Sequence, residues 1–404
     1  MKNQGIKICF LADKHDLYDD RIYWKMAVPL VQKGFQVYYF LIGNTTQKGI
    51  TQEGVHFKIF EVENFSKNKF VNFVLKVFKS KNYKKLFNAA KKIDADIYHF
   101  HDLWINKIGV KLKKLKSKPT VIYDVHEPYA EDFKSYYKGS YVKNNLMRLF
   151  SIWVDYWEKK QSKNYDLIIA TGPSVLDDFN QVLGESKVDI LYNFTDNYKL
   201  FEDIPIGDKK YDFIYSGGIT ELRGAMKILE ATKIAVKTNT NIKVLFIGKY
   251  NGKALLCKMK AYVKNNKLEN NVILHDFVNY SEISKFYNQS KIGLVTLFDI
   301  PTYRVSMPIK IFEYMAFGLP IIGSNFGIIA SYIDNEDIGI KIDPQSPEEI
   351  SNAMLNILGD KDTLDFYSKN GRQATLEKYR WDLELDKLVN HYLTLQNKRG
   401  KNAK

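Results

Sequence analysis

The chain of 404 residues is 45% hydrophobic and 14% aromatic, which excludes a disordered protein and suits two domains of about 200 residues. Its 60 lysines and arginines outnumber its 46 acidic residues, so the formal net charge is +14. The two cysteines, Cys9 and Cys257, lie far apart in the sequence, which argues against a disulfide scaffold and a cysteine-ligated metal.

The N-terminal sequence contains no apolar stretch long enough for a signal peptide. No window of the sequence reaches the roughly 18 uncharged apolar residues that a membrane-spanning helix needs. We therefore expect a cytoplasmic protein, or one that lies on the cytoplasmic face of a membrane.

Short β-rich runs alternate with helical sequence in two series along the chain. In the first series a helix is expected over 20–33, and the strands are expected at 6–12, 36–42, 96–100, 120–125 and 166–170. The strands of the second series are expected at 212–218, 242–248, 271–275, 292–296 and 319–324. This alternation predicts an α/β protein with two Rossmann-like βαβ domains that face each other across a cleft. The polar stretch 193–210 would join them.

A basic segment covers residues 65–92, with nine lysines and no acidic residue. Its first half places Phe70, Phe73, Val74, Val77 and Phe78 at helical spacing, and residues 111–118 add five more lysines. Three interpretations stay open: a solvated outer face, an anionic membrane surface, and nucleic acid. Nucleic acid is the weakest, because lysine outnumbers arginine and no nucleic-acid-binding motif occurs. We expect an anionic membrane surface as partner and no nucleic acid.

A glycine pair occurs at the end of the first strand of the second series. Gly217 and Gly218 would let a backbone approach a ligand closely, and Arg223 offers a forked donor for a phosphate. A glycine pair after a strand is also common in a simple turn. On its own, the glycine pair therefore does not distinguish a phosphate-binding loop from a simple turn.

The second feature of this domain is the helix expected at 309–317, which is apolar except for Lys310 and Glu313. Pro308 suits its first turn, and Ser306 is a possible cap. A helix N-terminus and a lysine suit a diphosphate, whereas a carboxylate suits the vicinal hydroxyls of a ribose. The alternative is a local ion pair on an exposed edge. With the glycine pair and Arg223, this helix predicts a nucleotide-diphosphate site in the second domain.

The sequence resembles the retaining, two-domain glycosyltransferases of family 4, which have the GT-B fold, over about residues 5–395. The strongest motif is PIKIFEYMAFGLPII, and YSGGITELRG and ILYNFTDN resemble further family motifs. DDRIYWK, DIYHFHD and VIYDVHE are similar to motifs of bacterial surface-polysaccharide enzymes of this family. The resemblance implies a C-terminal helix that crosses back to the first domain. The domains would then be 1–200 with 380–404, and 205–378.

The resemblance also implies roles for individual residues. In the second domain, Arg223 would contact the donor diphosphate, with Gly217 and Gly218 beside it, and Glu313 would hold the ribose. In the first domain, His126 would reach the reacting sugar, and Glu127 beside it is a second catalytic candidate. The acceptor-side candidates are His101, Asp102 and Arg21.

The sequence departs from the family pattern at several positions. Val305 stands where the first glutamate of the family's E-x7-E pair would fall, and Gly218 where its loop arginine would fall. Pro308 has no N–H to give to a sugar hydroxyl. Lys310 and Arg304 would then replace the positive charge that is lost at Gly218.

The function implied by the resemblance is transfer of a sugar from a UDP- or GDP-linked donor to a growing, lipid-linked bacterial surface glycan. No cofactor and no metal are expected, and the anomeric configuration would be retained. A sugar-nucleotide epimerase of the same architecture is an alternative, and a non-catalytic, membrane-binding relative is another. Because a lipid-linked acceptor lies at the membrane, the protein would bind peripherally to its inner face.

Overall fold

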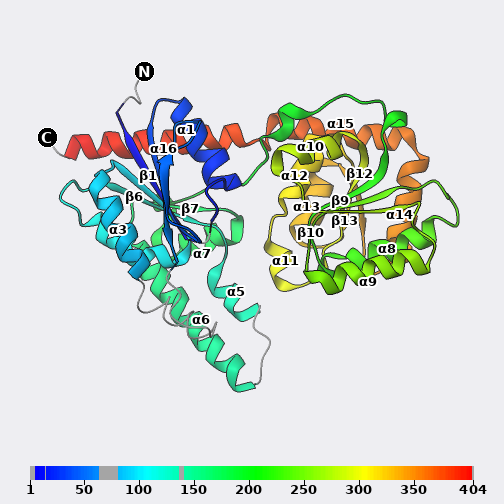
Figure 1. Cartoon of the computed structure of the whole chain (residues 1–404), viewed down its shortest axis with the longest axis horizontal. Coiled ribbons are helices and arrows are strands. Elements are labelled where there is room, and N and C mark those ends of the chain that lie inside the picture. Colours follow the sequence, from blue (N-terminus) through cyan, green and yellow to red (C-terminus); the bar gives the residue numbers. More distant parts are fainter. Residues whose placement is uncertain (1–4, 14, 63–80, 136–140, 403–404) are drawn as a thin grey trace. The chain divides into compact units, whose positions relative to one another are not determined.

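The computed structural model describes residues 5–13, 15–62, 81–135 and 141–402. The chain forms two compact units (Figure 1). Unit 1 comprises Met1–Asn193 and Leu383–Lys404, and unit 2 comprises Phe194–Asp382. Residues 194–200, expected in the first domain, belong to unit 2, where the ring of Phe194 packs 4.7 Å from that of Phe312.

Unit 1 is built on an eight-stranded sheet with the order β3-β4-β2-β1-β5-β6-β7-β8. All neighbouring strands are parallel except the β3–β4 pair, which is antiparallel. The strands are β1 (Lys7–Asp13), β2 (Gln36–Gly43), β3 (Gln47–Ile50), β4 (His56–Glu61), β5 (Ile97–His101), β6 (Thr120–Val125), β7 (Leu167–Ala170) and β8 (Val188–Ile190). Between β1 and β5 the chain switches from adding strands on one side of the sheet to adding them on the other. In such sheets, ligands bind at the carboxyl ends of the strands at this switch point.

Helices cover both faces of this sheet. One face packs against α3 (Lys81–Ile93), α4 (Asn106–Lys113), α6 (Tyr141–Ser162) and α7 (Pro173–Leu183). The remaining helical elements are η1 (Asp20–Ala27), α1 (Val28–Gln32), η2 (Leu103–Ile105), α5 (Tyr129–Ser135), η3 (Glu185–Lys187) and α16 (Trp381–Asn402). The helix expected over 20–33 is divided into the π-helix η1 and α1. Pro29 has no N–H to continue the α-helical bonds, and Val28 donates to Tyr23 five residues back.

The C-terminal helix α16 packs on unit 1, which confirms the predicted return to the first domain. The Tyr392 hydroxyl lies 2.6 Å from His99 Nδ1, and Lys387 Nζ pairs with Asp189 at 2.6 Å. Tyr392 is fully buried, so the helix completes the core of unit 1.

Unit 2 has a six-stranded, all-parallel sheet with the order β11-β10-β9-β12-β13-β14. The strands are β9 (Tyr211–Ile219), β10 (Val244–Tyr250), β11 (Val272–His275), β12 (Ser290–Val295), β13 (Ile321–Ser324) and β14 (Gly339–Ile342). This is the doubly wound order, and its direction reverses between β9 and β12. The two Rossmann-like α/β sheets confirm the predicted fold class.

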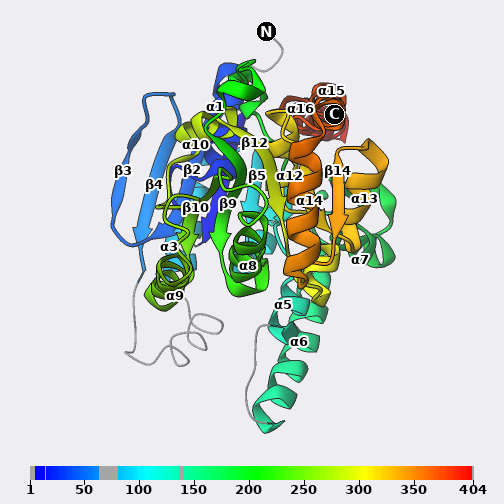
Figure 2. The same cartoon turned by 90° about the vertical axis from the view of Figure 1, so that its right-hand side faces the viewer.

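The helices of unit 2 also form two layers (Figure 2). One face of the sheet packs against α8 (Ala225–Ala235), α9 (Gly252–Asn265) and α14 (Pro347–Gly359). The other helical elements are η4 (Asn197–Leu200), η5 (Ile206–Asp208), η6 (Glu221–Arg223), α10 (Tyr280–Asn288), α11 (Pro301–Val305), α12 (Ile309–Ala316), α13 (Gly327–Glu336) and α15 (Lys361–Glu377).

One glycine fixes how closely α12 approaches the sheet. A Cβ atom on Gly293 of β12 would lie 2.2 Å from the ring of Tyr314, so only glycine fits there. The Tyr314 hydroxyl in turn accepts from the Ser216 N–H at 3.0 Å and donates to the Ile214 carbonyl at 3.2 Å. The helix that carries Lys310 and Glu313 is thereby held against β9.

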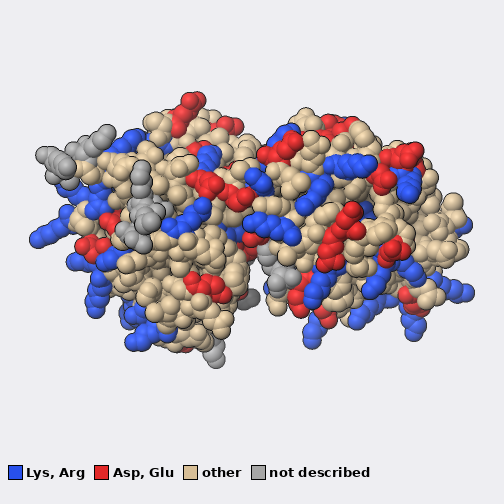
Figure 3. Space-filling view, turned by 90° about the horizontal axis from the view of Figure 1, so that it is seen from above, with Lys and Arg blue, Asp and Glu red and all other residues tan. Residues whose placement is uncertain are grey.

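The basic segment 65–92 is described only from Lys81 onward, and its apolar residues Phe70–Phe78 lie outside the described residues. In the described part, Tyr83, Leu86 and Ala90 of α3 are buried, whereas Lys84 and Lys91 are exposed. Figure 3 shows positive and negative side chains interspersed on the face that it views. No helix in the described ranges is both long and apolar enough to cross a bilayer.

Candidate active site

The candidate donor site lies in unit 2, where the strand order reverses. Gly217 and Gly218 both belong to β9, and Gly217 has a φ of 100°, which favours glycine. Gly248 of the neighbouring β10 packs directly on the Gly217 carbonyl, since a Cβ atom there would lie 1.9 Å from that oxygen. The backbone at Gly217 is therefore exposed on one side and tightly packed against Gly248 on the other.

Arg223 follows this strand at the end of η6. Its N–H donates to the Thr220 hydroxyl at 3.1 Å, which fixes the turn. Its guanidinium nitrogen lies 3.2 Å from the place that a Cβ atom on Gly218 would take. The glycine at 218 therefore leaves room for the Arg223 side chain, and this contact gives a physical reason for the departure from the family pattern.

Lys310 lies in the first turn of α12 and is only 8% exposed. Its ammonium nitrogen is 3.7 Å from the centre of the Tyr215 ring and has no hydrogen-bond partner among the described residues. Burial, followed by repulsion from Arg223, holds the pKa of Lys310 well below its usual value, and Glu313 offsets this in part. A buried lysine of this kind does not belong to an ion pair on an exposed edge.

Glu313 lies one turn further along α12 and is partly buried. Its Oε2 accepts a hydrogen bond from the Tyr287 hydroxyl at 2.8 Å. That hydroxyl also lies 3.0 Å from Ser216 Oγ on β9, so the carboxylate is oriented by a polar chain from the sheet. Tyr287 and Ser216 were not predicted, because no local sequence pattern connects them to Glu313.

Arg304, predicted to replace the charge that is missing at Gly218, has a carboxylate partner on the surface. Its guanidinium is exposed and binds Asp299 through two hydrogen bonds, of 2.6 and 2.5 Å. The replacement of that charge by Lys310 or Arg304 therefore stays a prediction. Its partner, Asp299, stands only five residues before Arg304 in the sequence.

A polar cluster in unit 1 is centred on Asp124, near the end of β6. Asp124 is fully buried, and Arg21 Nη2 lies 3.1 Å from its Oδ2. Burial alone would raise the pKa of Asp124, but Arg21 and the surrounding histidines lower it well below its usual value. The carboxylate is therefore charged and paired inside the unit.

Two histidines meet beside this carboxylate at neighbouring strand ends. His101 Nδ1 and His126 Nε2 are 2.9 Å apart, so one of these rings donates to the other. They lie 3.7 and 3.6 Å from the oxygens of Asp124. Burial lowers the pKa of both rings, which keeps them neutral, although Asp124 opposes this effect. His126 is partly exposed and His101 is buried.

A second chain of contacts continues from Asp102, whose φ is 74°. Asp102 accepts from the Asp13 N–H at 2.8 Å, and its other oxygen lies 3.3 Å from His15 Nε2. Burial would lower the pKa of His15, but its bonds to Asp102 and Asp19 raise it to about 10. His15 was not predicted, although its place just after the first strand of the unit was a usable signal.

His99, His101 and Asp124 are the group in the described residues whose geometry would allow a metal, since their ligand atoms lie within 4.8 Å of one another. Arg21 already contacts both oxygens of Asp124, at 3.3 and 3.1 Å. A metal ion would have to compete with this guanidinium for the one carboxylate. The donor set therefore fits a hydrogen-bonded network better than a metal centre.

The structure thus brings together most of the predicted residues within each unit. Unit 1 joins Arg21, His101 and His126 around Asp124. Asp102 belongs to the second chain, whose His15 ring lies 5.2 Å from that of His126, and Glu127 is exposed. Unit 2 joins Gly217, Gly218, Arg223, Lys310 and Glu313, whereas Arg304 pairs with Asp299.

Comparison with protein families matches both halves of the chain. Residues 196–374 match the family described as glycosyl transferases group 1, and residues 23–197 match glycosyltransferase family 4. The chain is 21% identical over 394 residues to an uncharacterized glycosyltransferase of Methanocaldococcus jannaschii, covering 91% of this chain and 92% of the relative. It is also 22% identical over 326 residues to an α-1,3-galactosyltransferase of Escherichia coli that uses UDP-Gal and GlcNAc-diphosphoundecaprenol, covering 77% and 78%.

Solved structures share the fold at low sequence identity. HepE of Anabaena, in complex with UDP and glucose, has a TM-score of 0.69 and 14% identity, covering 96% of this chain and all of the other. The lipopolysaccharide glycosyltransferase WaaG has a TM-score of 0.65 and 16% identity, covering 94% and 97%. Sucrose-phosphate synthase of Thermosynechococcus elongatus has a TM-score of 0.69 and 15% identity, covering 97% and 100%.

Proposed function

The chain belongs to glycosyltransferase family 4 and has the GT-B fold, and on this premise we propose that it transfers a sugar from a nucleotide diphosphate sugar to a lipid-linked glycan. The observation that carries the donor assignment is Lys310. Its ammonium group is buried in unit 2 without a hydrogen-bond partner in the described part of the chain, next to the open backbone of Gly217. A diphosphate is the ligand that would satisfy it.

The proposed chemistry needs positive charge at the diphosphate. As the bond between the sugar and the diphosphate breaks, negative charge grows on the leaving phosphate oxygens. Arg223 and Lys310 would stabilise this charge, which supports a transfer that needs no divalent metal. Glu313, held by Tyr287, would bind the ribose hydroxyls and so place the nucleotide. The donor sugar would be linked to UDP or GDP.

The network in unit 1 supports a role on the sugar side of the reaction. Burial lowers the pKa of His126, which favours its neutral ring, and the side chain is partly exposed. It can therefore form a hydrogen bond with a sugar hydroxyl. Asp124 and His101 would fix the orientation of its ring. We propose that retention of the anomeric configuration follows the family.

The proposed acceptor is a lipid-linked bacterial surface glycan, of a capsule, exopolysaccharide or O-antigen. The Escherichia coli relative acts on a diphosphoundecaprenol-linked sugar, and WaaG is involved in lipopolysaccharide biosynthesis. The exposed lysines of α3 would suit the anionic inner face of the plasma membrane. The protein would then bind there peripherally.

A thermal-shift screen of UDP- and GDP-sugars tests the donor assignment. A ligand present at 100 times its Kd should stabilise the folded chain by about 2.7 kcal/mol. Release of nucleotide that requires a glycan acceptor would identify a transferase, whereas conversion of the sugar nucleotide without acceptor would identify an epimerase. A chain that binds no nucleotide sugar would contradict the proposal.

A further inference from the structure

Helix α6 presents large apolar side chains to solvent. Of the sixteen large hydrophobic residues that are exposed in the described ranges, five lie between positions 146 and 156 of this helix. Leu149 is 65% exposed and Tyr156 is 62% exposed. Such a concentration is unusual for the surface of a soluble protein and marks an interaction site.

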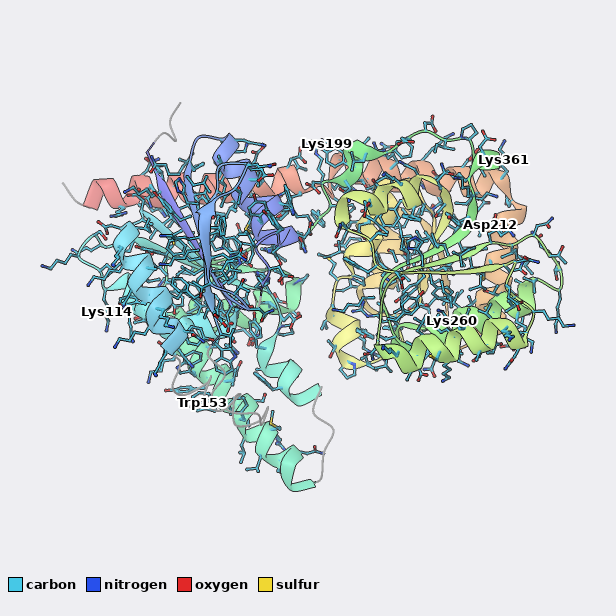
Figure 4. All side chains as sticks on the ribbon, viewed as in Figure 1. Lys114, Trp153, Lys199, Asp212, Lys260 and Lys361 are labelled. Atoms are coloured by element: carbon cyan, nitrogen blue, oxygen red, sulfur yellow. The ribbon has the colours of Figure 1, made fainter. Side chains whose placement is uncertain are left out.

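The exposed residues form one face of the helix. Leu146, Leu149, Ile152 and Tyr156, here called the α6 stripe, follow one another at intervals of three or four residues, which places them in a single band. Trp153, labelled in Figure 4, borders this band. The opposite face carries the buried residues Ser151, Val154 and Glu158. The helix therefore packs on unit 1 with one side and leaves a second apolar side uncovered by the described residues.

Positive side chains outnumber negative ones around the stripe. Arg148, Lys160 and Lys163 are exposed, and the ammonium group of Lys160 lies 5.6 Å from the centre of the Tyr156 ring. The acidic residue beside the stripe, Asp155, shares Lys159 with Asp178, at 2.9 and 2.6 Å. Basic side chains that flank an apolar band match the requirements of an anionic bilayer surface.

The position of α6 in unit 1 strengthens this match. Figures 1 and 2 both show α6 extending away from the sheet of unit 1. On the same face of that sheet, α4 packs against both α6 and the lysine-rich α3. The exposed lysines of α3 and the α6 stripe thus belong to one side of the unit.

We propose that the α6 stripe inserts into the surface of an anionic lipid bilayer. Leucine, isoleucine and tyrosine side chains would enter the boundary between headgroups and acyl chains, and the lysines would contact the headgroups. This proposal concerns a surface apart from the donor site and does not rest on the identity of the donor sugar. A second copy of the chain fits less well, because pairing two α6 helices would bring Arg148, Lys160 and Lys163 close to one another.

The test is sedimentation of the full chain with phosphatidylcholine vesicles, with and without phosphatidylglycerol. Wild type should sediment with the anionic vesicles. The variant Leu149→Gln/Ile152→Gln should bind them at least about tenfold more weakly, since two inserted apolar side chains are lost. The control Ile50→Gln/Phe277→Gln changes two equally exposed apolar residues outside α6 and should bind like wild type. A melting temperature like that of wild type shows that each variant is folded.

A second variant separates α6 from the basic segment. Lys67, Lys69, Lys76 and Lys79 are changed together to glutamine, which removes charge and leaves the α6 stripe intact. The measurement is the fluorescence of Trp153, in a protein whose other tryptophans have been replaced. If the proposal is correct, anionic vesicles at low salt shift the Trp153 emission of this variant to the blue, as they do without the four lysine changes. Unchanged vesicle binding by Leu149→Gln/Ile152→Gln would overturn the proposal. A wild-type dimer in solution that Leu149→Gln/Ile152→Gln converts to a monomer would also overturn it. That result would show that a second copy of the chain covers the α6 stripe.

Discussion

The ammonium nitrogen of Lys310 lies 3.7 Å from the centre of the Tyr215 ring, within a site that Arg223 makes still more positive. The ring face attracts the cation, but burial and the nearby guanidinium hold the pKa of Lys310 well below its usual value. A bound diphosphate would reverse this balance, because a negative charge stabilises the protonated amine.

Binding of a nucleoside diphosphate should therefore raise the pKa of Lys310 and take up protons. Titration calorimetry in buffers of different ionisation enthalpy measures this uptake. Wild type should take up more protons than Lys310→Met between neutral and alkaline pH. Equal proton uptake by the two proteins would show that Lys310 does not face the phosphates.

Glu313 should distinguish a ribose from a deoxyribose. If its carboxylate accepts from the ribose hydroxyls, wild type should bind the 2′- or 3′-deoxy nucleotide more weakly than the ribonucleotide, by about 1.5–3 kcal/mol. In Glu313→Ala this preference should disappear. Tyr287→Phe, which removes the hydrogen bond that orients the carboxylate, should retain a reduced preference. A preference that survives in Glu313→Ala would place the ribose elsewhere.

His126 should affect the chemical step more than nucleotide binding. His126→Ala is expected to lower kcat by about 100-fold or more while nucleotide affinity stays close to that of wild type. His56→Ala, in the same unit but outside the network, is the matched control. Steady-state kinetics together with nucleotide titration decide the point. A collapse of nucleotide affinity at unchanged kcat would assign His126 to the donor site.

The same residue predicts a pH dependence. Because burial lowers the pKa of His126 below 6.5, its neutral form persists as the pH falls through that value. In wild type, the fall of kcat on the acid side that comes from protonation of His126 should therefore lie below pH 6.5. His126→Ala should lack this fall. An acid limb above that value, lost in the variant, would contradict the lowered pKa.

Glu158 on α6 predicts a dependence of stability on pH. Burial raises its pKa to about 8, and in the unfolded chain its pKa is near 4.5. The unfolded chain therefore binds fewer protons than the native protein between these values, so this residue makes unfolding easier as the pH rises from 4.5 to 8. Glu158→Gln should raise Tm by at least about 3 °C at pH 8.5 and change it little at pH 4.5. An equal change at both pH values would exclude a protonated Glu158.

The pattern of the sequence predicted the fold better than the site. The buried strands β1, β5 and β6 and the helix α12 have clear apolar patterns, and the structure confirms them. The short strands β8 and β14 lack such a pattern, since their place in the sheet depends on tertiary pairing. The apolar run in α6 was also missed, because a stripe that stays exposed looks in sequence like one that is buried.

Site residues at strand ends could be predicted, because parallel strands bring their carboxyl ends to one edge of the sheet. His101, Asp102 and His126 follow this rule. Arg21 and Tyr287 come from helices, and only the three-dimensional packing shows that they contact Asp124 and Glu313. Arg304 illustrates the reverse case, in which a partner close in sequence, Asp299, binds a predicted site residue.

The most direct test of the donor site is a titration of wild type and Lys310→Met with the nucleoside diphosphate of the donor found in the thermal-shift screen. Lys285→Met, which removes an exposed lysine of the same unit, is the control. Wild type and Lys285→Met should bind alike, and Lys310→Met should lose on the order of 2–3 kcal/mol of binding free energy. Equal affinity in all three proteins would contradict a diphosphate site at the N-terminus of α12.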